Sequence, residues 1–355
     1  MKVTALVGAQ YGSEGKGVVA NYLADDYDYW VRTGGPNAGH SFVHQGKICK
    51  MQCLPCGWTN KGAMLILGPG AVVNPDVLLQ ELDWIEKEYD PKIRDRVMVD
   101  RMATPLLPSH SQREGHTKGE IHERIGSTGE GVGAARQDWM SRNRVVTEPF
   151  GELAQRLRFE GKVQVVSDTA ELLSLSRRIK KSIMLEGTQG FGLSLTHGTW
   201  PYCTSTDTTA GQLAVDAGIP PRALTDVIMV ARTFPIRVAG NSGPMKDETD
   251  WDSMSERLHK KVVEQTTVTK LTRRVGAWDE ELVQRACNVN GPTEIALTFM
   301  DYMAPEDEGV THYDELSDRS LSFIDYVERF FETPVALIGT GFSVEKGWTC
   351  VDRNR

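Results

Sequence analysis

The sequence lacks the features that mark membrane, secreted and nucleic-acid-coating proteins. It contains no run of 18 apolar residues, the length that a membrane-spanning helix needs. No secretory signal pattern opens it, because Lys2 is followed directly by an apolar segment that is predicted to form a strand. Six cysteines in 355 residues are too few for a disulfide scaffold, so we expect a reducing, cytoplasmic setting. The formal charge of −8 argues against a general nucleic-acid-binding surface, although loops can still supply positive charge for small anionic ligands.

Internal repeats, linkers and low-complexity tracts are also absent, which favours a single domain over residues 1–355. The hydrophobic share of 40% and the charged share of 25% are ordinary for a globular protein. Apolar runs typical of strands alternate with segments of helical periodicity, and the runs occupy residues 3–7, 64–67, 97–99, 163–166, 183–185, 226–232, 294–299 and 335–338. This alternation predicts an α/β fold with a largely parallel central sheet, flanking helices and ligands at the carboxyl edge of the strands.

The first apolar run leads into a glycine-rich stretch with one lysine, Gly8-Ala-Gln-Tyr-Gly-Ser-Glu-Gly-Lys-Gly17, and a helical segment follows. A strand, a glycine turn with lysine and a helix together present backbone N–H groups to a phosphate. The Walker A pattern is not met, because Gln10 replaces its first glycine and Gly17 replaces its hydroxyl residue, and the dinucleotide-binding pattern is not met either. From spacing alone, a phosphate-binding loop and a tight turn that binds nothing both remain open.

The cysteines at positions 49, 53 and 56 have the spacing C-x3-C-x2-C. Thiolates at this spacing on a loop could hold an iron–sulfur cluster. However, residues 46–54 have the pattern of an extended segment, in which Cys49, Met51 and Cys53 share one face. We therefore favour a buried apolar face. Farther along the chain, residues 103–144 are polar and have no apolar period, which is typical of a functional or mobile segment.

Taken together, these stretches resemble the adenylosuccinate synthetase family. Residues 8–17 match the family's G-x-Q-[WF]-G-D-E-G-K-G with one change, and residues 32–41 match its R-x-x-G-G-x-N-A-G-H-T. Further matches cover residues 124–133, 186–190, 197–204, 205–211, 273–276 and 298–301. The cysteine segment aligns with an apolar stretch of the family. Because the resemblance covers nearly the whole chain in order, it implies the family's P-loop-like α/β fold.

The resemblance also implies a two-step ligation. A nucleoside triphosphate phosphorylates O6 of a 6-oxopurine nucleotide, and the amino group of aspartate then displaces that phosphate. The implied catalytic residues are Ser13, Lys16 and His40, with His40 donating to the charge that develops between O6 and the phosphoryl group. The triphosphate site implied is Gly12, Ser13, Glu14, Gly15, Lys16, Gly17, Gly39, His40, Ser41, Asp301, Gly339, Thr340 and Gly341. The purine-nucleotide site implied is Ser13, Asn37, Ser127, Thr128, Arg142, Gln189, Thr204 and Val238.

The remaining implied roles concern aspartate, metal and assembly. Thr269 and Arg273 would grip the aspartate carboxylates. Ser13 and the carbonyl of Gly39 would hold Mg²⁺. Arg142 would reach the nucleotide's 5′-phosphate from a neighbouring subunit, which implies a homodimer.

Three departures from the family's pattern concern the substrates. Ser13 stands where the family has the aspartate that takes the N1 proton and binds Mg²⁺, and a serine hydroxyl is a poor base. Leu271 replaces an arginine that reaches the ribose 2′-hydroxyl, which fits a deoxyribose. Phe299 replaces a lysine that, with an aspartate, recognises the guanine of GTP, so ATP or dATP becomes the expected donor.

These departures resemble the phage branch of the family, which joins aspartate to dGMP, and that branch would place the chain in a host cytoplasm. The altered end of the family's G-T-G-P-x-R motif, here Gly339-Thr-Gly-Phe-Ser343, adds to them. An ordinary reaction of IMP with aspartate and GTP is the alternative within the family. A catalytically silent nucleotide-binding protein is the alternative from another class.

Overall fold

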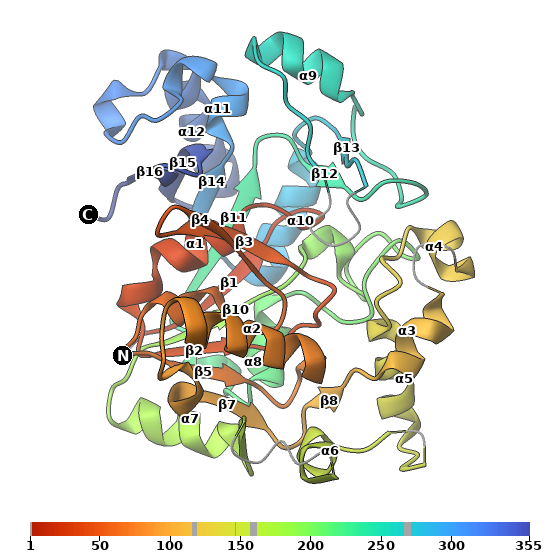
Figure 1. The fold of residues 1–355 in the computed structure, drawn as a ribbon. Coiled ribbons are helices and arrows are strands. Elements are labelled where there is room, and N and C mark those ends of the chain that lie inside the picture. Colours follow the sequence, from red (N-terminus) through yellow and green to blue (C-terminus); the bar gives the residue numbers. More distant parts are fainter. Residues whose placement is uncertain (1, 116–118, 146, 157–161, 266–270) are drawn as a thin grey trace.

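A ten-stranded sheet runs through the centre of the chain (Figure 1). The computed structural model describes residues 2–115, 119–145, 147–156, 162–265 and 271–355. The spatial order of the strands is β16 (Gly347–Asp352), β15 (Val335–Ser343), β14 (Glu294–Thr298), β11 (Asp226–Arg232), β1 (Val3–Gly8), β10 (Ile183–Glu186), β2 (Tyr29–Arg32), β5 (Met64–Leu67), β7 (Val97–Asp100) and β9 (Gln164–Val166). Neighbouring strands pair in parallel, except that β16 is antiparallel to β15. The predicted α/β fold with a largely parallel sheet is confirmed.

Helices flank this sheet on both sides (Figure 1). They are α1 (Lys16–Tyr22), α2 (Pro75–Glu88), α3 (Pro108–Glu114), α4 (Glu120–Ile125), α5 (Val132–Ser141), α6 (Phe150–Arg156), α7 (Thr169–Arg178), α8 (Ala210–Asp216), α9 (Trp251–Leu258), α10 (Glu280–Asn290), α11 (Met300–Met303) and α12 (Asp318–Phe331). Small two-stranded sheets pair β3 (His40–His44) with β4 (Lys47–Met51), β6 (Val72–Val73) with β8 (Thr104–Pro105), and β12 (Ile236–Arg237) with β13 (Arg274–Val275).

The sheet is buried on both faces, and β1 shows how its sequence achieves this. Val3, Ala5 and Val7 point into one hydrophobic cluster and Leu6 into the other, as the two-residue period of a strand requires. The polar Thr4 is fully buried, but its hydroxyl accepts a hydrogen bond of 2.8 Å from the hydroxyl of Tyr27. Burying each larger apolar side chain contributes about 1.5–3 kcal/mol. A continuous apolar run is therefore a sound signal for this strand.

The C-terminal end of the sheet differs from the prediction. The sequence predicts that the last strand ends near residue 338 and that Gly339-Thr-Gly341 forms a loop. Instead β15 continues to Ser343 and pairs with an additional strand, β16. Trp348 of β16 packs directly over Gly339, where an added Cβ would lie 2.7 Å from the indole nitrogen. The glycine here serves close packing inside a strand, and the predicted loop is wrong.

The polar region 103–144 also holds structure that the sequence does not predict, because α3, α4 and α5 lie within it. Helix α5 buries the small residues Ala134 and Ala135, so it leaves no strong apolar period. The carboxylate of Glu114, at the end of α3, accepts hydrogen bonds from the amides of Gly131 (2.7 Å) and Ala134 (3.0 Å). This long-range cap stabilises the start of α5.

The carboxyl ends of five adjacent parallel strands meet at one edge of the sheet. These strands are β2, β10, β1, β11 and β14, and they end at Arg32, Glu186, Gly8, Arg232 and Thr298. In open α/β sheets this edge is where ligands bind.

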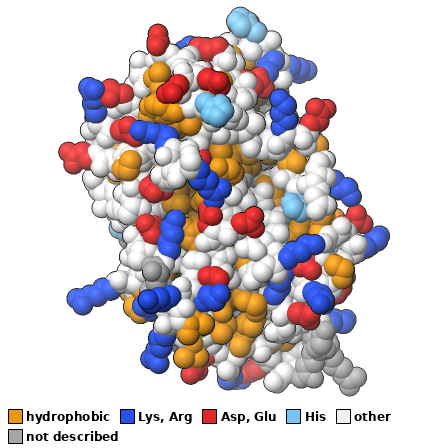
Figure 2. All heavy atoms as spheres, turned by 90° about the vertical axis from the view of Figure 1, so that its left-hand side faces the viewer, with side chains coloured by type: hydrophobic (Ala, Val, Ile, Leu, Met, Phe, Trp, Pro, Cys, Tyr) orange, Lys and Arg blue, Asp and Glu red, His pale blue; other side chains and the backbone are white. Residues whose placement is uncertain are grey.

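The face shown in Figure 2 carries intermingled basic and acidic side chains. In the described ranges of the chain, no helix has both the length and the apolar character to cross a membrane.

Candidate active site

The glycine-rich stretch forms a loop between β1 and α1, as predicted. Gly12, Ser13 and Gly15 have φ angles of 85°, 56° and 98°, in the left-handed region. Glycine adopts this region freely, whereas a non-glycine residue does so at a cost of about 1–2 kcal/mol. The side chain of Ser13 is exposed. The loop therefore presents Ser13 outward on a backbone that its neighbours must hold in place.

Glu14 organises the loop from within. Its carboxylate is fully buried and accepts hydrogen bonds from the amides of Gln10 (3.0 Å) and Gly12 (2.8 Å). The Nζ of Lys16 lies 2.5 Å from its other oxygen. An ammonium has three donors, so Lys16 keeps capacity for a phosphate. The Gly12 amide has a single hydrogen, and it already donates that hydrogen to Glu14. It could bind a phosphate only after that hydrogen bond breaks, so the predicted contact between Gly12 and phosphate is not formed in this arrangement.

His40, Glu186 and Arg32 meet at the ends of three strands. Arg32 and Glu186 are register partners at the ends of β2 and β10, and His40 begins β3. Oε1 of Glu186 lies 2.7 Å from Nδ1 of His40 and accepts a hydrogen bond of 2.9 Å from Arg32. The amide of Cys56 donates to Oε2 at 2.7 Å. Arg32 also donates to the carbonyl of Ala38 at 2.6 Å, which fixes the chain just before Gly39.

Burial and the charge of Arg32 lower the pKa of His40 to about 4, against the hydrogen bond that the ring makes with Glu186. Burial alone would raise the pKa of Glu186, but the hydrogen bond from His40 and the charge of Arg32 hold it below its usual value. At neutral pH the imidazole is therefore neutral and donates Nδ1–H to the carboxylate, which leaves Nε2 with its lone pair. The predicted donor role of His40 toward substrate requires a protonated ring, which a bound phosphoryl group would favour.

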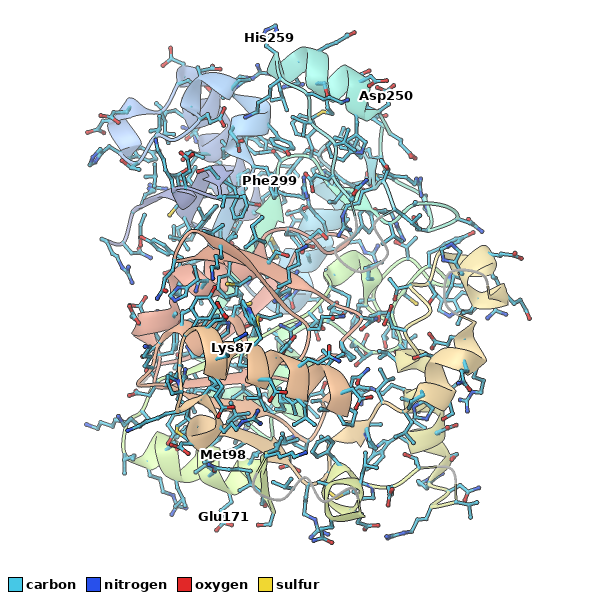
Figure 3. All side chains as sticks on the ribbon, viewed as in Figure 1. Lys87, Met98, Glu171, Asp250, His259 and Phe299 are labelled. Atoms are coloured by element: carbon cyan, nitrogen blue, oxygen red, sulfur yellow. The ribbon has the colours of Figure 1, made fainter. Side chains whose placement is uncertain are left out.

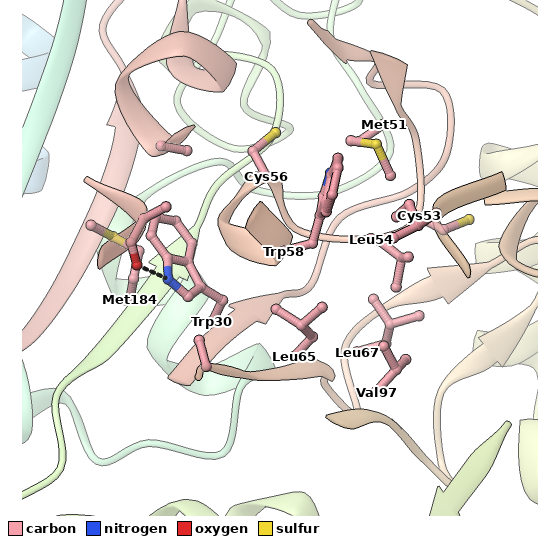
Figure 4. Close-up of a cluster of buried hydrophobic side chains, with 14 of the residues drawn as sticks. Trp30, Met51, Cys53, Leu54, Cys56, Trp58, Leu65, Leu67, Val97 and Met184 are labelled. Carbon is pink, nitrogen blue, oxygen red and sulfur yellow. Dashed lines mark hydrogen bonds between the residues drawn. The ribbon is translucent and has the colours of Figure 1, made fainter. Parts of the chain in front are cut away.

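The cysteine segment forms the buried apolar face that we favour from the sequence. Cys49 and Met51 face inward from β4, and Cys53 follows them into the same cluster. Trp30 and Trp58 pack in this cluster (Figure 4).

Cys56 lies closer to the strand ends. Its Sγ, a ring nitrogen of His40 and a carboxylate oxygen of Glu186 are all within 4.8 Å of one another. The guanidinium of Arg32 already neutralises that carboxylate, so these residues fit a buried ion pair better than a metal site.

Asn37 and Gln189, both predicted to hold the purine nucleotide, lie together. Nε2 of Gln189 donates to Oδ1 of Asn37 at 3.2 Å. Oε1 of Gln189 is buried and has no hydrogen-bond partner in the described part of the chain. Since buried polar atoms normally have partners, this acceptor is available to a ligand that carries an N–H donor, such as a purine ring.

Glycines allow the predicted stretches to approach one another closely. An added Cβ on Gly17 would lie 2.9 Å from the Cβ of His40 and 3.0 Å from the amide nitrogen of Ser41. One on Gly190 would lie 2.1 Å from a carboxylate oxygen of Glu14. The structure thus brings the glycine-rich loop, the 37–41 segment and the Gln189 loop to one place.

The segment after β14 also lies next to the glycine-rich loop. The hydroxyl of Thr298 donates to the carbonyl of Glu14 at 2.6 Å. Asp301 is buried, and burial is the main cause that raises its pKa to about 7. Phe299 lies between the sheet and α9 (Figure 3). Thr340 lies inside β15, where its hydroxyl donates to the carbonyl of Val310 at 2.7 Å.

The other predicted nucleotide residues are located through their hydrogen bonds and close contacts. Ser242 donates to the carbonyl of Val238 at 2.6 Å, and an added Cβ on Gly126 would lie 2.8 Å from the Cβ of Ser242, so Val238 is near the segment that contains Ser127 and Thr128. The amide of Thr204 donates to the carbonyl of Leu193 at 2.8 Å.

Arg142 is exposed at the C-terminal end of α5. Figure 1 shows this helix at the edge of the molecule opposite α1. Within the described chain, Arg142 is not brought to the glycine-rich loop.

Arg273, predicted to bind aspartate, donates its amide to the carbonyl of Glu264 at 2.9 Å. Burial lowers the pKa of its guanidinium to about 10, against the charge of Glu264. Thr269 lies outside the described residues. Leu271 is 38% exposed.

The sequence predictions assign no role to Glu186 or to the side chain of Arg32. The available signal is a charged residue directly after a short apolar run, because such a residue lies at the carboxyl edge of a buried strand.

The family model for adenylosuccinate synthetase matches residues 5–164 and 146–308 of this chain. The chain belongs to the adenylosuccinate synthetase family. It is 36% identical to adenylosuccinate synthetase of Methanococcus aeolicus over 344 residues, covering 96% of this chain and 97% of the relative. It is 37% identical to adenylosuccinate synthetase of Pyrococcus horikoshii over 348 residues, covering 97% of each. As a member of this family, the protein is a carbon–nitrogen ligase of the adenylosuccinate synthetase type.

Solved structures of the family agree with the fold. Fully ligated adenylosuccinate synthetase from Plasmodium falciparum superposes with a TM-score of 0.85 at 22% identity, covering 99% of this chain and 100% of that one, which supports the fold. Succinoaminodeoxyadenylate synthetase of cyanophage S-2L, bound to dGMP and to dATP as an energy donor, superposes with a TM-score of 0.81 at 31% identity. That match covers 98% of this chain and 95% of the other.

Proposed function

We propose that this ligase joins L-aspartate to C6 of dGMP. In the first step, the γ-phosphoryl group of ATP or dATP passes to O6 of the guanine, whose N1 proton is lost, and the nucleoside diphosphate leaves. In the second step, the aspartate amine bonds to C6, the C6–O6 bond breaks, and inorganic phosphate departs as the amine loses a proton. The product is 2-amino-2′-deoxyadenylosuccinate, a precursor for diaminopurine DNA.

The observation that carries the proposal is the outward-facing Ser13. Its neutral, short side chain stands where the family has a carboxylate directed at purine N1. Guanine differs from hypoxanthine by a 2-amino group beside N1, and a serine hydroxyl can accept a hydrogen bond from that group. The orphaned acceptor of Gln189 adds a second group that suits the N–H donors of guanine.

Some relatives of this chain favour dGMP as the substrate and others favour IMP. The cyanophage structure was solved with dGMP and dATP, and its protein is 31% identical to this chain. The archaeal relatives, at 36–37% identity, are adenylosuccinate synthetases, which favours IMP as the alternative substrate. The departures at Ser13, Leu271 and Phe299 are the reason that we propose dGMP.

The chain's own residues divide the chemistry between them. Lys16 and the loop backbone would bind the transferred phosphoryl group, and His40, protonated when the phosphoryl group is bound, would stabilise charge at O6. Asn37 and Gln189 would orient the purine, and Arg273 would grip aspartate.

The predicted Mg²⁺ ligands are the hydroxyl of the exposed Ser13 and the carbonyl of the half-buried Gly39. These neutral oxygens fit a Mg²⁺ that is held mainly by substrate phosphates and water. Such a metal would neutralise charge on the phosphates.

A homodimer belongs to the same proposal. Arg142 is exposed at the end of α5, and its neighbours Met140 and Val145 expose 75% and 92% of their surface. Exposed apolar side chains around a basic residue suit a subunit interface.

A mass-detected matrix of IMP, GMP and dGMP against ATP, dATP and GTP, with aspartate and Mg²⁺, tests the function. We expect the highest kcat/KM for dGMP with ATP or dATP. Turnover of IMP without turnover of dGMP would contradict the proposal. Binding without turnover of any pair would favour a catalytically silent nucleotide-binding protein.

A further inference from the structure

Arg232, at the carboxyl end of β11, has a fully buried side chain beside the glycine-rich loop. Its backbone exchanges two hydrogen bonds of 3.0 Å with the side chain of Gln10. Its guanidinium donates to both carboxylate oxygens of Glu264, at 2.6 Å and 3.2 Å. A buried guanidinium is tolerated only when it is paired in this way, and the planar fork makes the pairing directional.

The same guanidinium donates to the carbonyl of Ser13 at 3.0 Å. Ser13 has the unfavourable φ angle of 56°, so its backbone needs such an external contact to stay in place. Arg232 thus holds the main chain of the residue that faces purine N1 in the proposed function.

The flat face of Arg232 stacks on Phe299, with 3.8 Å between the guanidinium carbon and the ring centroid. Phe299 also has a left-handed φ angle, of 58°, and its carbonyl accepts a hydrogen bond of 2.6 Å from Thr233. Phe299 occupies the position that we assign to recognition of the donor's base. One side chain therefore touches both the purine-selecting loop and the donor-selecting residue.

Glu264 extends this contact to a third place. Its backbone carbonyl accepts the amide of Arg273, the residue proposed to grip aspartate. We propose that Arg232 and Glu264 are a positioning pair that couples the Ser13 loop, Phe299 and Arg273, so that purine selection and aspartate binding depend on one ion pair, whose guanidinium is buried and whose carboxylate is partly exposed. This inference rests on the proposed function for the roles of those sites.

The test compares Arg232→Lys and Glu264→Gln with the double variant. Lysine keeps the charge but loses the fork and the stacking, and glutamine keeps one acceptor but loses the charge. We expect either single change to raise KM for aspartate about tenfold and to narrow the discrimination between dGMP and IMP. The double variant should be no worse than the worse single one, because both remove the same contact.

Arg96→Lys is the matched control. Arg96 is also buried, and it makes two contacts with Asp90, of 2.8 Å and 2.9 Å, from outside the site. This variant should lower the thermal midpoint but leave KM for aspartate unchanged. If the Arg232 and Glu264 variants lose stability as the control does, with unchanged KM and discrimination, or if their effects add in the double variant, the coupling proposal is wrong.

If Arg232→Lys does not fold, Glu264→Gln and Glu264→Asp carry the test alone. The shorter side chain in Glu264→Asp should also lower the affinity for the substrate L-aspartate. Each variant is assayed with whichever nucleotide the unmodified enzyme turns over. A preference for IMP in the unmodified enzyme would overturn the proposed substrate, whereas the aspartate KM of the variants would still decide the coupling.

Discussion

The Nδ1 atom of His40 lies 2.7 Å from Oε1 of Glu186, and Arg32 donates to that same oxygen at 2.9 Å. The carboxylate thereby fixes the tautomer and the orientation of the imidazole, and it offsets the cost of protonating a buried ring. The guanidinium in turn keeps the carboxylate ionised. These contacts make Glu186 a positioning residue for His40.

Glu186→Gln should lower kcat by about 100-fold while KM for the nucleotide changes little, because the neutral amide no longer supports a protonated His40. The change should also cost a few kcal/mol of stability, because Arg32 loses its buried anion. Steady-state kinetics and thermal unfolding measure the two effects separately.

Glu81→Gln controls for the loss of a buried carboxylate. Glu81 is also buried, and it accepts backbone hydrogen bonds from Gln52, Cys53 and Leu54 without touching His40. It should reduce stability with a much smaller loss of kcat. Equal kcat losses in both variants would show that Glu186 acts through the fold alone.

Ser13→Asp should shift the ratio of kcat/KM for IMP to that for dGMP by at least about tenfold toward IMP. The new carboxylate can take the N1 proton and bind Mg²⁺, while it loses the hydroxyl that suits the 2-amino group. Competition between the two nucleotides in one reaction measures the ratio directly.

Ser13→Ala separates the two causes, because it removes the hydroxyl without adding a base. It should lower dGMP turnover without any gain with IMP. An unchanged preference in Ser13→Asp would place the determinant of purine choice elsewhere.

The sequence predicts the central strands well because both faces of the sheet are covered. Val3 to Val7 can then be nearly all apolar, and a short run of that kind before a glycine turn is typical of a buried parallel strand. The start of α2 is equally visible, because Asn74 caps the amides of Asp76 and Val77 as its position before a proline predicts. Such features can be predicted from the sequence because they depend on neighbouring residues alone.

Features that depend on distant partners are not visible in the same way. Strand β16 is half-buried at the sheet edge, so it has no distinctive apolar pattern. Two contacts of the site form only when the strand ends are brought together by folding. They are the hydrogen bonds of Glu14 to the loop amides and the stacking of Arg232 on Phe299. The glycine-rich loop with Lys16 can be predicted from its own pattern, whereas the other site residues can be predicted only through resemblance to a family, and the contacts of all of them require the fold.

Phe299→Lys should raise GTP use relative to ATP about tenfold, because lysine restores the residue that, with Asp301, recognises guanine in the family. The variant also loses the stacking on Arg232, so a fall in overall kcat is expected. Initial rates with each triphosphate give the ratio. Phe299→Leu is the control, and it should lower kcat without favouring GTP.

Asp216→Asn should stabilise the protein at neutral pH. Burial raises the pKa of Asp216 to about 6, against a hydrogen bond from Gln212 and the charge of Arg136. The folded state therefore holds this proton more tightly than the unfolded state, and stability falls as pH rises from about 4 to 6. A shift of about two units corresponds to at most ~3 kcal/mol.

The difference in free energy of unfolding between Asp216→Asn and the unmodified protein should thus grow from pH 4 to pH 6 and then level off. Urea titrations across this range measure it. Asp314→Asn is the control, because Asp314 is exposed and its replacement removes the same charge without a change in burial. A difference that is flat with pH would contradict the buried, protonated carboxyl.

Arg142→Ala tests the shared site through complementation. If Arg142 serves the neighbouring subunit, then both Arg142→Ala and His40→Asn should be nearly inactive alone. A mixed dimer restores one intact site, in the subunit that keeps His40 and receives Arg142 from its partner. Random mixing makes half of the dimers mixed, each with one of two sites active, so co-refolded protein should regain about a quarter of the unmodified activity. Molar mass from light scattering checks that the variants are dimers. Dimers without recovery would place Arg142 in its own subunit's site, and monomers would remove the proposed interface.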